Sequence, residues 1–364
     1  MKLSFIEVEN FRNLRSATVE IHPGTNVLLG ENAQGKTALV EAIYLMACAK
    51  SFRTPRYRDL ICHGEERAQI LIGVEGEGLP FQLKMVLDEK EGKAIFKNGV
   101  RLTRLSEFLG LFRVVLFCPE HLSLIKDGPS KRRSFLDSAI CQLRPYFASL
   151  LNECNKIEGQ RAALLKQCDK KNIPGELFEV WNDRLAEVSV KIASIRALYI
   201  KELARFSPEH FSRISSGKER LSLSYHSHVY REDLSAEEMK KAYLSLLEST
   251  FEGDKKYGFT QKGVHHDDLV LTVNGFDART FASQGQQRSC VLALKLAEGE
   301  ISRKMTGKDP VYLLDDVLSE LDEGRRNYVT GGLAGKQVIL TGTDEDAFRF
   351  ADRIHPVKEG VYTR

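Results

Sequence analysis

An eight-residue stretch, GENAQGKT, constrains this chain more than any other feature. It matches the phosphate-binding loop pattern G-x-x-x-x-G-K-[ST] and consists of Gly30, Glu31, Asn32, Ala33, Gln34, Gly35, Lys36 and Thr37. Glycines let such a loop curl until its backbone N–H groups point at phosphate oxygens, and the following helix adds its positive N-terminal end. In this pattern Lys36 reaches the β- and γ-phosphates, and the Thr37 hydroxyl holds Mg²⁺.

The loop also has the flanking elements that the motif requires. Asn26–Leu29 is a short apolar run that can form a buried strand, and Thr37–Lys50 is apolar enough for a buried helix. The sequence therefore predicts a strand, a phosphate-binding loop and a helix in this order.

A second apolar strand, Val311–Leu314, ends in two carboxylates. An acid at the end of such a strand lies beside the metal ion of a neighbouring phosphate-binding loop. Asp315 is expected to hold Mg²⁺ or its water together with Thr37, and Asp316 to polarise the attacking water. Lys36, Asp315 and Asp316 are the candidate catalytic residues, and the distance between them along the chain implies a large insertion inside the nucleotide domain.

Two polar segments accompany the acidic strand. The first opens a predicted helix that continues to Ile301, so its free N–H groups and a hydroxyl can bind an anion. The second, Ser319–Asp322, directly follows the acidic strand. The first segment consists of Ser283, Gln284, Gly285 and Gln286.

Along the rest of the chain, the predicted secondary structure changes from strands to helices and back to strands. With 364 residues, two or more domains are expected. Apolar residues from Arg132 to about Ser207 recur at alternating spacings of four and three, which predicts paired helices joined around residues 169–175 and kinked at Pro145. Ordinary globular helices without a supercoil fit these short stretches equally well. A small antiparallel set of strands is expected at Gln69–Val74, Phe81–Leu87 and Ala94–Lys97.

Taken in order, these motifs resemble the ABC-type ATPases of chromosome maintenance and DNA repair. Two further stretches, Lys50–Thr54 and Phe117–Leu122 running to Asp137, resemble the RecF family of bacterial DNA replication and repair proteins. The resemblance implies an α/β fold, an ABC-type P-loop ATPase head with a small antiparallel β subdomain and an inserted helical, coiled-coil-like hairpin domain. The expected boundaries are 1–125 and 261–364 for the two parts of the head and 126–260 for the insertion.

The resemblance also implies a function. ATP and Mg²⁺ are the expected cofactors, and ATP is expected to drive a homodimer in which the Ser283–Gln286 signature of one subunit caps the nucleotide of the other. Ser319 and Asp322 would lie at that interface, and Arg12 and Asn13 would touch the nucleotide. Members of the family bind double-stranded DNA, gapped DNA and single/double-strand junctions, and act with RecR and RecO to load a recombinase during homologous recombination and the SOS response.

Departures from the family pattern predict a weak, DNA-stimulated ATPase that works as a timer. Thr341–Thr343 stands where related transporter ATPases have a switch histidine, and Asp316 is shorter than their glutamate base. A nucleotide-gated DNA-binding scaffold with little hydrolysis remains an alternative, as does a transporter motor or another ABC-type ATPase. A small-molecule kinase would leave the Ser283–Gln286 and Ser319–Asp322 segments without a role.

Contacts with DNA must come from local clusters, because the net charge is only +3. The candidates fall in two basic loops, and solvated surface charges or contacts to ATP are the alternative interpretation. Such clusters predict salt-dependent binding without sequence specificity. The candidates are Lys50, Arg53, Arg56, Arg58, Lys131, Arg132 and Arg133.

The remaining signals are weaker. Seven scattered cysteines predict reduced thiols, and a cytoplasmic protein without a membrane span is expected. His265–Asp268 superficially resembles a set of metal ligands, but no further ligand has a suitable spacing, and a structural hairpin near the signature helix is the preferred interpretation. Trp181 lies in a helical stripe that predicts a place in the core.

Overall fold

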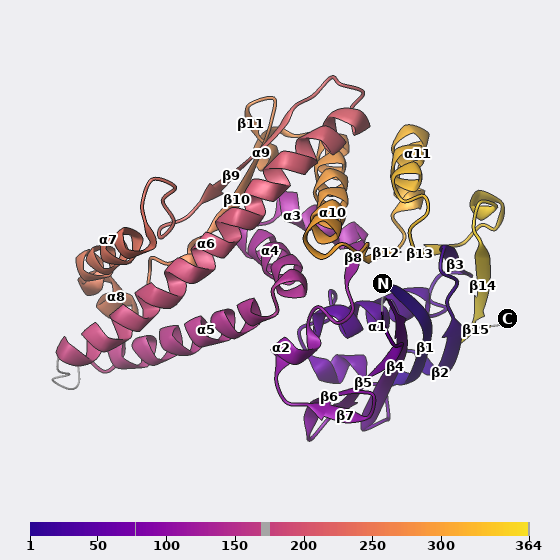
Figure 1. Cartoon of the computed structure of the whole chain (residues 1–364), viewed down its shortest axis with the longest axis horizontal. Coiled ribbons are helices and arrows are strands. Elements are labelled where there is room, and N and C mark those ends of the chain that lie inside the picture. The colour runs from indigo at the N-terminus through magenta and orange to yellow at the C-terminus, as the bar shows by residue number, and fades with distance from the viewer. Residues whose placement is uncertain (77, 169–174, 363–364) are drawn as a thin grey trace.

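The computed structural model describes residues 1–76, 78–168 and 175–362. Figure 1 shows a head that contains both termini and a helical arm that extends from it. One side of the head is a six-stranded antiparallel sheet, and the three predicted strands of the small antiparallel set lie in it. In spatial order its strands are β2 (Leu14–Glu20), β1 (Lys2–Phe11), β4 (Arg67–Glu75), β5 (Phe81–Asp88), β6 (Gly92–Lys97) and β7 (Val100–Leu102).

A second six-stranded sheet carries the predicted motifs. Its strands are parallel apart from the last hairpin, and both predicted motif strands lie in it, separated by one strand. In order they are β15 (Val361–Tyr362), β14 (Arg353–Lys358), β3 (Thr25–Leu29), β13 (Val338–Gly342), β12 (Val311–Leu314) and β8 (Val114–Phe117). Because the carboxyl ends of parallel strands meet at one edge, the loop after β3 and the acids after β12 come together.

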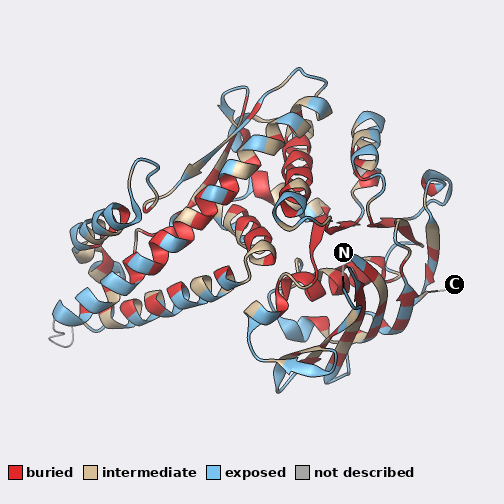
Figure 2. Ribbon diagram, in the orientation of Figure 1, coloured by how far each residue is buried: buried red, intermediate tan, exposed pale blue. Residues whose placement is uncertain are grey.

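Alternate residues of these parallel strands face two different cores. Leu313 and Ile339 pack with helix α1 (Lys36–Cys48) and the antiparallel sheet, whereas Leu314 and Leu340 join the core on the other face. The helices α10 (Gln284–Thr306) and α11 (Glu323–Gly332) contribute to that second core. Figure 2 shows α1 as almost continuously buried, and the strands β12 and β8 are buried along their whole length. The phosphate-binding loop is therefore anchored at both ends in packed elements.

The arm has its own apolar core, which α10 shares. The two long helices α5 and α6 run side by side as the predicted hairpin, and the connection at residues 169–174 lies outside the described residues. Trp181 is half-buried against this core. The helices are α2 (Leu105–Phe108), α3 (Ser123–Lys126), α4 (Pro129–Leu143), α5 (Tyr146–Leu165), α6 (Gly175–Ile214), α7 (Ala236–Ser249), α8 (Phe251–Tyr257) and α9 (Ala278–Phe281), and the strands of the third sheet are β9 (Leu221–His226), β10 (Asp268–Val273) and β11 (Phe276–Asp277).

One expectation about the arm needs correction. Pro145 does not kink one long helix but separates two, because α4 ends at Leu143 and α5 begins at Tyr146. Arg144, the residue before the proline, has φ −133° and ψ 80°, as expected from the clash that keeps such a residue out of the helical region. The predicted boundary after residue 260 lies between β9 and β10, which pair with each other in one sheet.

No helix among the described residues is long and apolar enough to cross a membrane.

Candidate nucleotide-binding site

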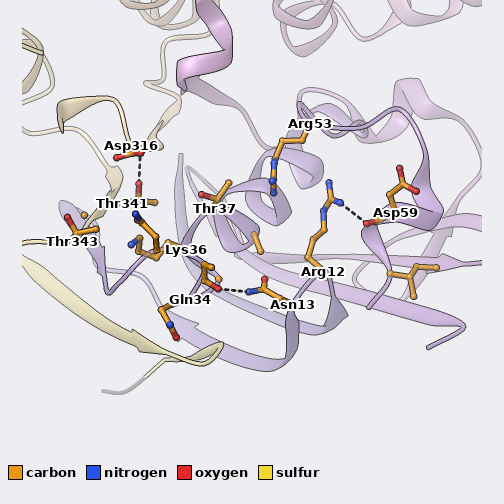
Figure 3. A pocket seen from close by; sticks show the side chains of 16 residues that line it. Arg12, Asn13, Gln34, Lys36, Thr37, Arg53, Asp59, Asp316, Thr341 and Thr343 are labelled. Atoms are coloured by element: carbon orange, nitrogen blue, oxygen red, sulfur yellow. Dashed lines mark hydrogen bonds between the residues drawn. The ribbon is translucent and has the colours of Figure 1, made fainter. Parts of the chain in front are cut away.

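One cavity of about 540 Å³ lies between the phosphate-binding loop, the turn after β1 and the ends of the parallel strands. Figure 3 shows the Lys36 and Thr37 side chains on one side of it and Arg12 and Arg53 on the other. Most of the predicted nucleotide-binding residues therefore meet at one place. The lining consists of Arg12, Asn13, Asn32, Ala33, Gln34, Gly35, Lys36, Thr37, Ala38, Arg53, Asp59, Ile61, Asp316, Thr341, Gly342 and Thr343.

The loop has the backbone conformation that an anion cradle needs. Ala33 and Gly35 have positive φ angles of 65° and 105°. A Cβ atom at Gly35 would lie 2.6 Å from the side chain of Leu14, so only glycine fits there. Lys36 donates hydrogen bonds to the carbonyls of Gly30 and Glu31, the latter at 2.9 Å. Burial lowers the pKa of Lys36, an effect that the two strand-end aspartates oppose.

Thr37 and Asp315 form the predicted metal pair. The Thr37 hydroxyl donates to Asp315 Oδ1 at 3.0 Å. Asp315 is buried, and this burial raises the pKa of its carboxyl group although hydrogen bonds from Thr37 and Thr341 oppose the shift. Carboxylate and hydroxyl oxygens are the ligands that Mg²⁺ prefers. The pair therefore fits Mg²⁺ in donor type and in its place beside the loop.

Thr341 connects the two aspartates. In the sequence it stood out only because it lies where related transporter ATPases have a switch histidine. Its hydroxyl donates to Asp315 Oδ1 at 3.1 Å and accepts the backbone N–H of Asp316 at 2.8 Å. Asp316 has a positive φ of 52°, and its carboxylate accepts a hydrogen bond of 2.9 Å from Ser319. The candidate water-polarising group is thus fixed by Thr341 on one side and by the predicted dimer segment on the other.

Glu41 is a functional residue that the sequence analysis missed. It is fully buried on α1, and its carboxylate accepts hydrogen bonds of 2.9 and 2.8 Å from Arg12. Arg53 lies 3.5 Å from the same carboxylate, and Ser51 donates to it. Glu41 therefore holds two cations at the rim of the cavity. The only sequence signal was a lone acid in an apolar helix.

Asn13 contacts the loop itself, since its amide donates to the Ala33 carbonyl at 3.1 Å.

The predicted signature lies outside the cavity, because the cavity lining in the described part of the chain does not include Ser283–Gln286. Ser283 begins α10, where its hydroxyl accepts the backbone N–H of Gln286 at 3.2 Å. Arg325 on α11 donates to the Gly285 carbonyl at 3.3 Å and forms an ion pair with Asp322, which begins α11. The signature and the predicted dimer segment are therefore tied together within one chain.

The basic residues that were predicted to contact DNA lie in different environments. Lys50 and Lys131 line a common hollow of about 150 Å³ near the junction of head and arm. Arg56 and Arg58 remain exposed farther along the segment that contains Lys50, and Arg58 pairs with Glu89 at 2.5 Å. Arg53 belongs to the nucleotide cavity instead, in agreement with the alternative of an ATP-side contact.

Arg132 and Arg133 do not fit the prediction of a DNA contact. Arg132 is buried and pairs with Asp268 at 2.7 and 2.9 Å, and it also donates to two carbonyls. Arg133 donates to the Asp267 carbonyl at 2.9 Å. Arg132 therefore connects α4 to the carboxylate of Asp268 at the start of β10, and Arg133 connects α4 to the backbone of the residue before that strand.

The histidine-rich segment is also engaged in structural contacts. His265 lies 2.6 Å from Glu158, and Asp267 pairs with Arg196 at 2.9 Å. Among the described residues, no group of three or more histidine, cysteine or acidic side chains could hold a metal ion.

Comparison with known proteins gives consistent matches over nearly the whole chain. The family of the RecF/RecN/SMC N terminal domain matches residues 2–361. The DNA replication and repair protein RecF of Alkaliphilus oremlandii is 38% identical, with 93% of this chain and 92% of that protein covered. The corresponding protein of Halalkalibacterium halodurans is 39% identical, with 95% and 94% covered.

Solved structures agree with these matches. A structure of the recombination mediator protein RecF with ATP has a TM-score of 0.94 and 33% identity, and the match covers 99% of this chain and 96% of that one. An Smc head bound to the C-winged helix domain of ScpA has a TM-score of 0.57 at 16% identity, with 100% and 96% covered, which is a likeness of fold alone.

Proposed function

The chain belongs to the RecF family of DNA replication and repair proteins, and we propose that it is an ATP-dependent DNA-binding protein of recombinational repair and replication-fork maintenance. The observation that carries the proposal is the hydrogen bond of 3.0 Å between Thr37 and Asp315. It joins the phosphate-binding loop to the acidic strand, and the known shared task of these two motifs is to hold Mg²⁺ on a nucleoside triphosphate.

ATP is the proposed nucleotide, in line with the ATP-bound structure of the related RecF protein. Lys36 would exchange its two loop carbonyls for the β- and γ-phosphates, while the loop N–H groups bind the phosphate oxygens. Arg12 and Arg53 add two positive charges at the rim. Thr37 and Asp315 would hold Mg²⁺, which neutralises charge on the phosphates when it is bound.

Asp316 is the residue that we propose to orient and polarise the attacking water. The Ser319 hydroxyl donates to the Asp316 carboxylate at 2.9 Å. The movement of this carboxylate therefore depends on the segment Ser319–Asp322, which we place at the dimer interface. Hydrolysis is therefore proposed to be weak and to reset the protein after DNA has been bound. The same contact also suits a scaffold with little hydrolysis. Single-turnover hydrolysis of ATP by the wild type, with and without DNA and with Lys36→Met as the control, separates the two functions.

We further propose that ATP assembles a homodimer. The signature at Ser283 begins the 23-residue helix α10, whose N-terminus favours an anion. Since the signature does not line the cavity of its own chain, a second subunit would place it over the γ-phosphate. Ser319 and Asp322 would follow it into the interface, because Arg325 ties Asp322 to the signature helix.

Sedimentation velocity with and without ATP and a gapped duplex tests this assembly. Wild type is expected to shift from monomer to dimer with ATP, and Ser283→Arg to remain monomeric. Ser235→Arg is the matched control, because Ser235 caps α7 in the arm with the same hydroxyl-to-N–H geometry as Ser283. A wild type that binds ATP and stays monomeric would rule out the capped dimer.

The DNA surface is proposed to include Lys50 and Lys131 at the junction of head and arm, with Arg56 and Arg58 as an outer pair. Double-stranded DNA, gapped DNA and strand junctions are the proposed ligands, and RecR and RecO the proposed partners in loading a recombinase. Replacing Lys50 and Lys131 by glutamine should weaken binding to all DNA sequences alike and flatten its salt dependence. Lys191→Gln, on an exposed i,i+4 pair of the arm, is the control.

A further inference from the structure

The C-terminal hairpin of β14 and β15 contacts the phosphate-binding loop from outside the cavity. Within the described part of the chain, none of the hairpin residues 359–362 lines the cavity. One contact is made by Gln34, whose side chain accepts the backbone N–H of Glu359. Figure 3 shows this side chain directed away from Lys36 and toward the yellow C-terminal strands.

Three successive carbonyls of the loop each receive a hydrogen bond from outside the loop. Asn13 donates to Ala33 O, the Gly360 N–H to Gln34 O, and the Tyr362 hydroxyl to Gly35 O, each at 3.1 Å. The donors come from two different places in the head, the turn after β1 and the end of the chain.

These contacts affect the direction in which the backbone N–H and C=O groups of the loop point. An anion cradle needs its N–H groups turned inward, and therefore its carbonyls turned outward, because an inward carbonyl would repel phosphate. Ala33 and Gly35 have the positive φ angles that let a loop curl in this way. A left-handed conformation is unfavourable for a non-glycine residue such as Ala33, so it persists only where other contacts stabilise it.

The donor group of Tyr362 is suited to a permanent contact. Burial raises the pKa of the Tyr362 hydroxyl, and the nearby Asp315 carboxylate adds to this rise. The hydroxyl therefore stays protonated and able to donate throughout the physiological pH range.

We propose that Asn13, the Gly360 N–H and Tyr362 form a brace that holds the loop in its anion-binding conformation, so that the C-terminal hairpin sets the affinity for the triphosphate. Tyr362 acts here as a positioning residue, and so does Asn13, which the sequence analysis placed against the nucleotide. The inference rests on the proposed function only in that the loop binds ATP.

Tyr362→Phe tests the brace, because it keeps the ring and removes one donor. The loop N–H groups bind the phosphates in the ground state and in the transition state alike, so KM for ATP should rise with kcat unchanged. A rise of roughly three- to tenfold is expected from the loss of one neutral hydrogen bond. The midpoint of thermal unfolding without nucleotide should fall by a few degrees at most, as it does in the control variant described next, so the change in KM separates the two variants.

Tyr243→Phe is the matched control. The Tyr243 hydroxyl donates to the Lys262 carbonyl at 2.8 Å in the arm, so its loss should lower the unfolding temperature and leave KM unchanged. Asn13→Ala removes the opposite donor of the brace and should raise KM in the same way as Tyr362→Phe. If Tyr362→Phe does not fold, the KM of Asn13→Ala tests the brace instead.

The outcomes distinguish the brace from the nucleotide site itself. If wild type binds ATP and both brace variants keep KM within twofold of wild type, the brace is refuted and the nucleotide site stands. If wild type does not bind ATP, the proposed nucleotide function fails and the brace fails with it.

Discussion

The buried carboxylate of Glu41 makes a sharp test of how the nucleotide cavity is built. Glu41 is fully buried, and it binds Arg12 through two hydrogen bonds of 2.8 and 2.9 Å and Arg53 at 3.5 Å. Glu41→Gln keeps the size of the side chain and removes its charge. The two guanidinium groups then lose the acid that positions them at the rim of the cavity.

The expected loss of stability follows from the burial of the three partners. Removing one partner of a fully buried ion pair costs about 3–5 kcal/mol. The side chains of Arg12 and Arg53 are 20% and 43% exposed, so water can solvate them in part and the lower end applies, about 3 kcal/mol. For a chain of this size this corresponds to a fall of about 5 °C in the unfolding midpoint.

The same substitution should weaken ATP binding, because Arg12 and Arg53 are no longer held toward the phosphates. An increase of about tenfold or more in Kd, equal to about one charge-assisted hydrogen bond, is expected. Calorimetric unfolding and titration with a fluorescent ATP analogue measure the two effects separately. Glu66→Gln, which breaks the exposed pair of Glu66 and Lys90, should leave both unchanged. An unchanged Kd in Glu41→Gln would refute the idea that this acid positions the cavity cations.

Three further predictions concern single side chains. Thr341→Val removes the contacts to both strand-end aspartates, so kcat should fall roughly 10- to 100-fold with Kd for ATP nearly unchanged, which single-turnover and equilibrium titrations would show. Arg325→Met separates the signature helix from the dimer segment, so the ATP-dependent monomer–dimer equilibrium in sedimentation should move toward monomer without loss of ATP binding. Burial lowers the pKa of His355 to about 4, so the folded state resists the protonation that the unfolded chain accepts below its ordinary pKa of 6.5. Stability from this residue is present above pH 6.5 and is lost as the pH falls toward 4, and His355→Gln should flatten the decline of the unfolding midpoint over that range.

The parts of the site that are continuous in the chain could be predicted from the sequence. The loop from Gly30 to Thr37 and the acids after Val311–Leu314 have local signatures, because a buried parallel strand reads as an unbroken apolar run that ends in polar groups. The known pairing of these two motifs predicted that the segments meet, and the hydrogen bond between Thr37 and Asp315 shows that they do.

The parts that could not be predicted depend on side chains that meet across the fold. Whether Arg53 points at DNA or at a nucleotide depends on where Glu41 lies, and no local pattern connects the two. Arg132 has the same charge and a similar sequence neighbourhood, but Asp268 holds it inside the arm. Residue type gives the charge of a basic cluster, and only the packing of long side chains decides which members remain free for phosphate.

The contacts of Asp316 suggest how a dimer could control hydrolysis without a switch histidine. In the single chain, Ser319 donates to the Asp316 carboxylate, which uses an acceptor site that a water molecule would otherwise occupy. If the segment of Ser319 turns toward a second subunit, that acceptor becomes available to water while Thr341 continues to hold the backbone of Asp316. Ser319→Ala should therefore raise the hydrolysis rate of the monomer and reduce its stimulation by dimer formation. A rate that stays unchanged in the monomer would show that Ser319 does not restrain the acid.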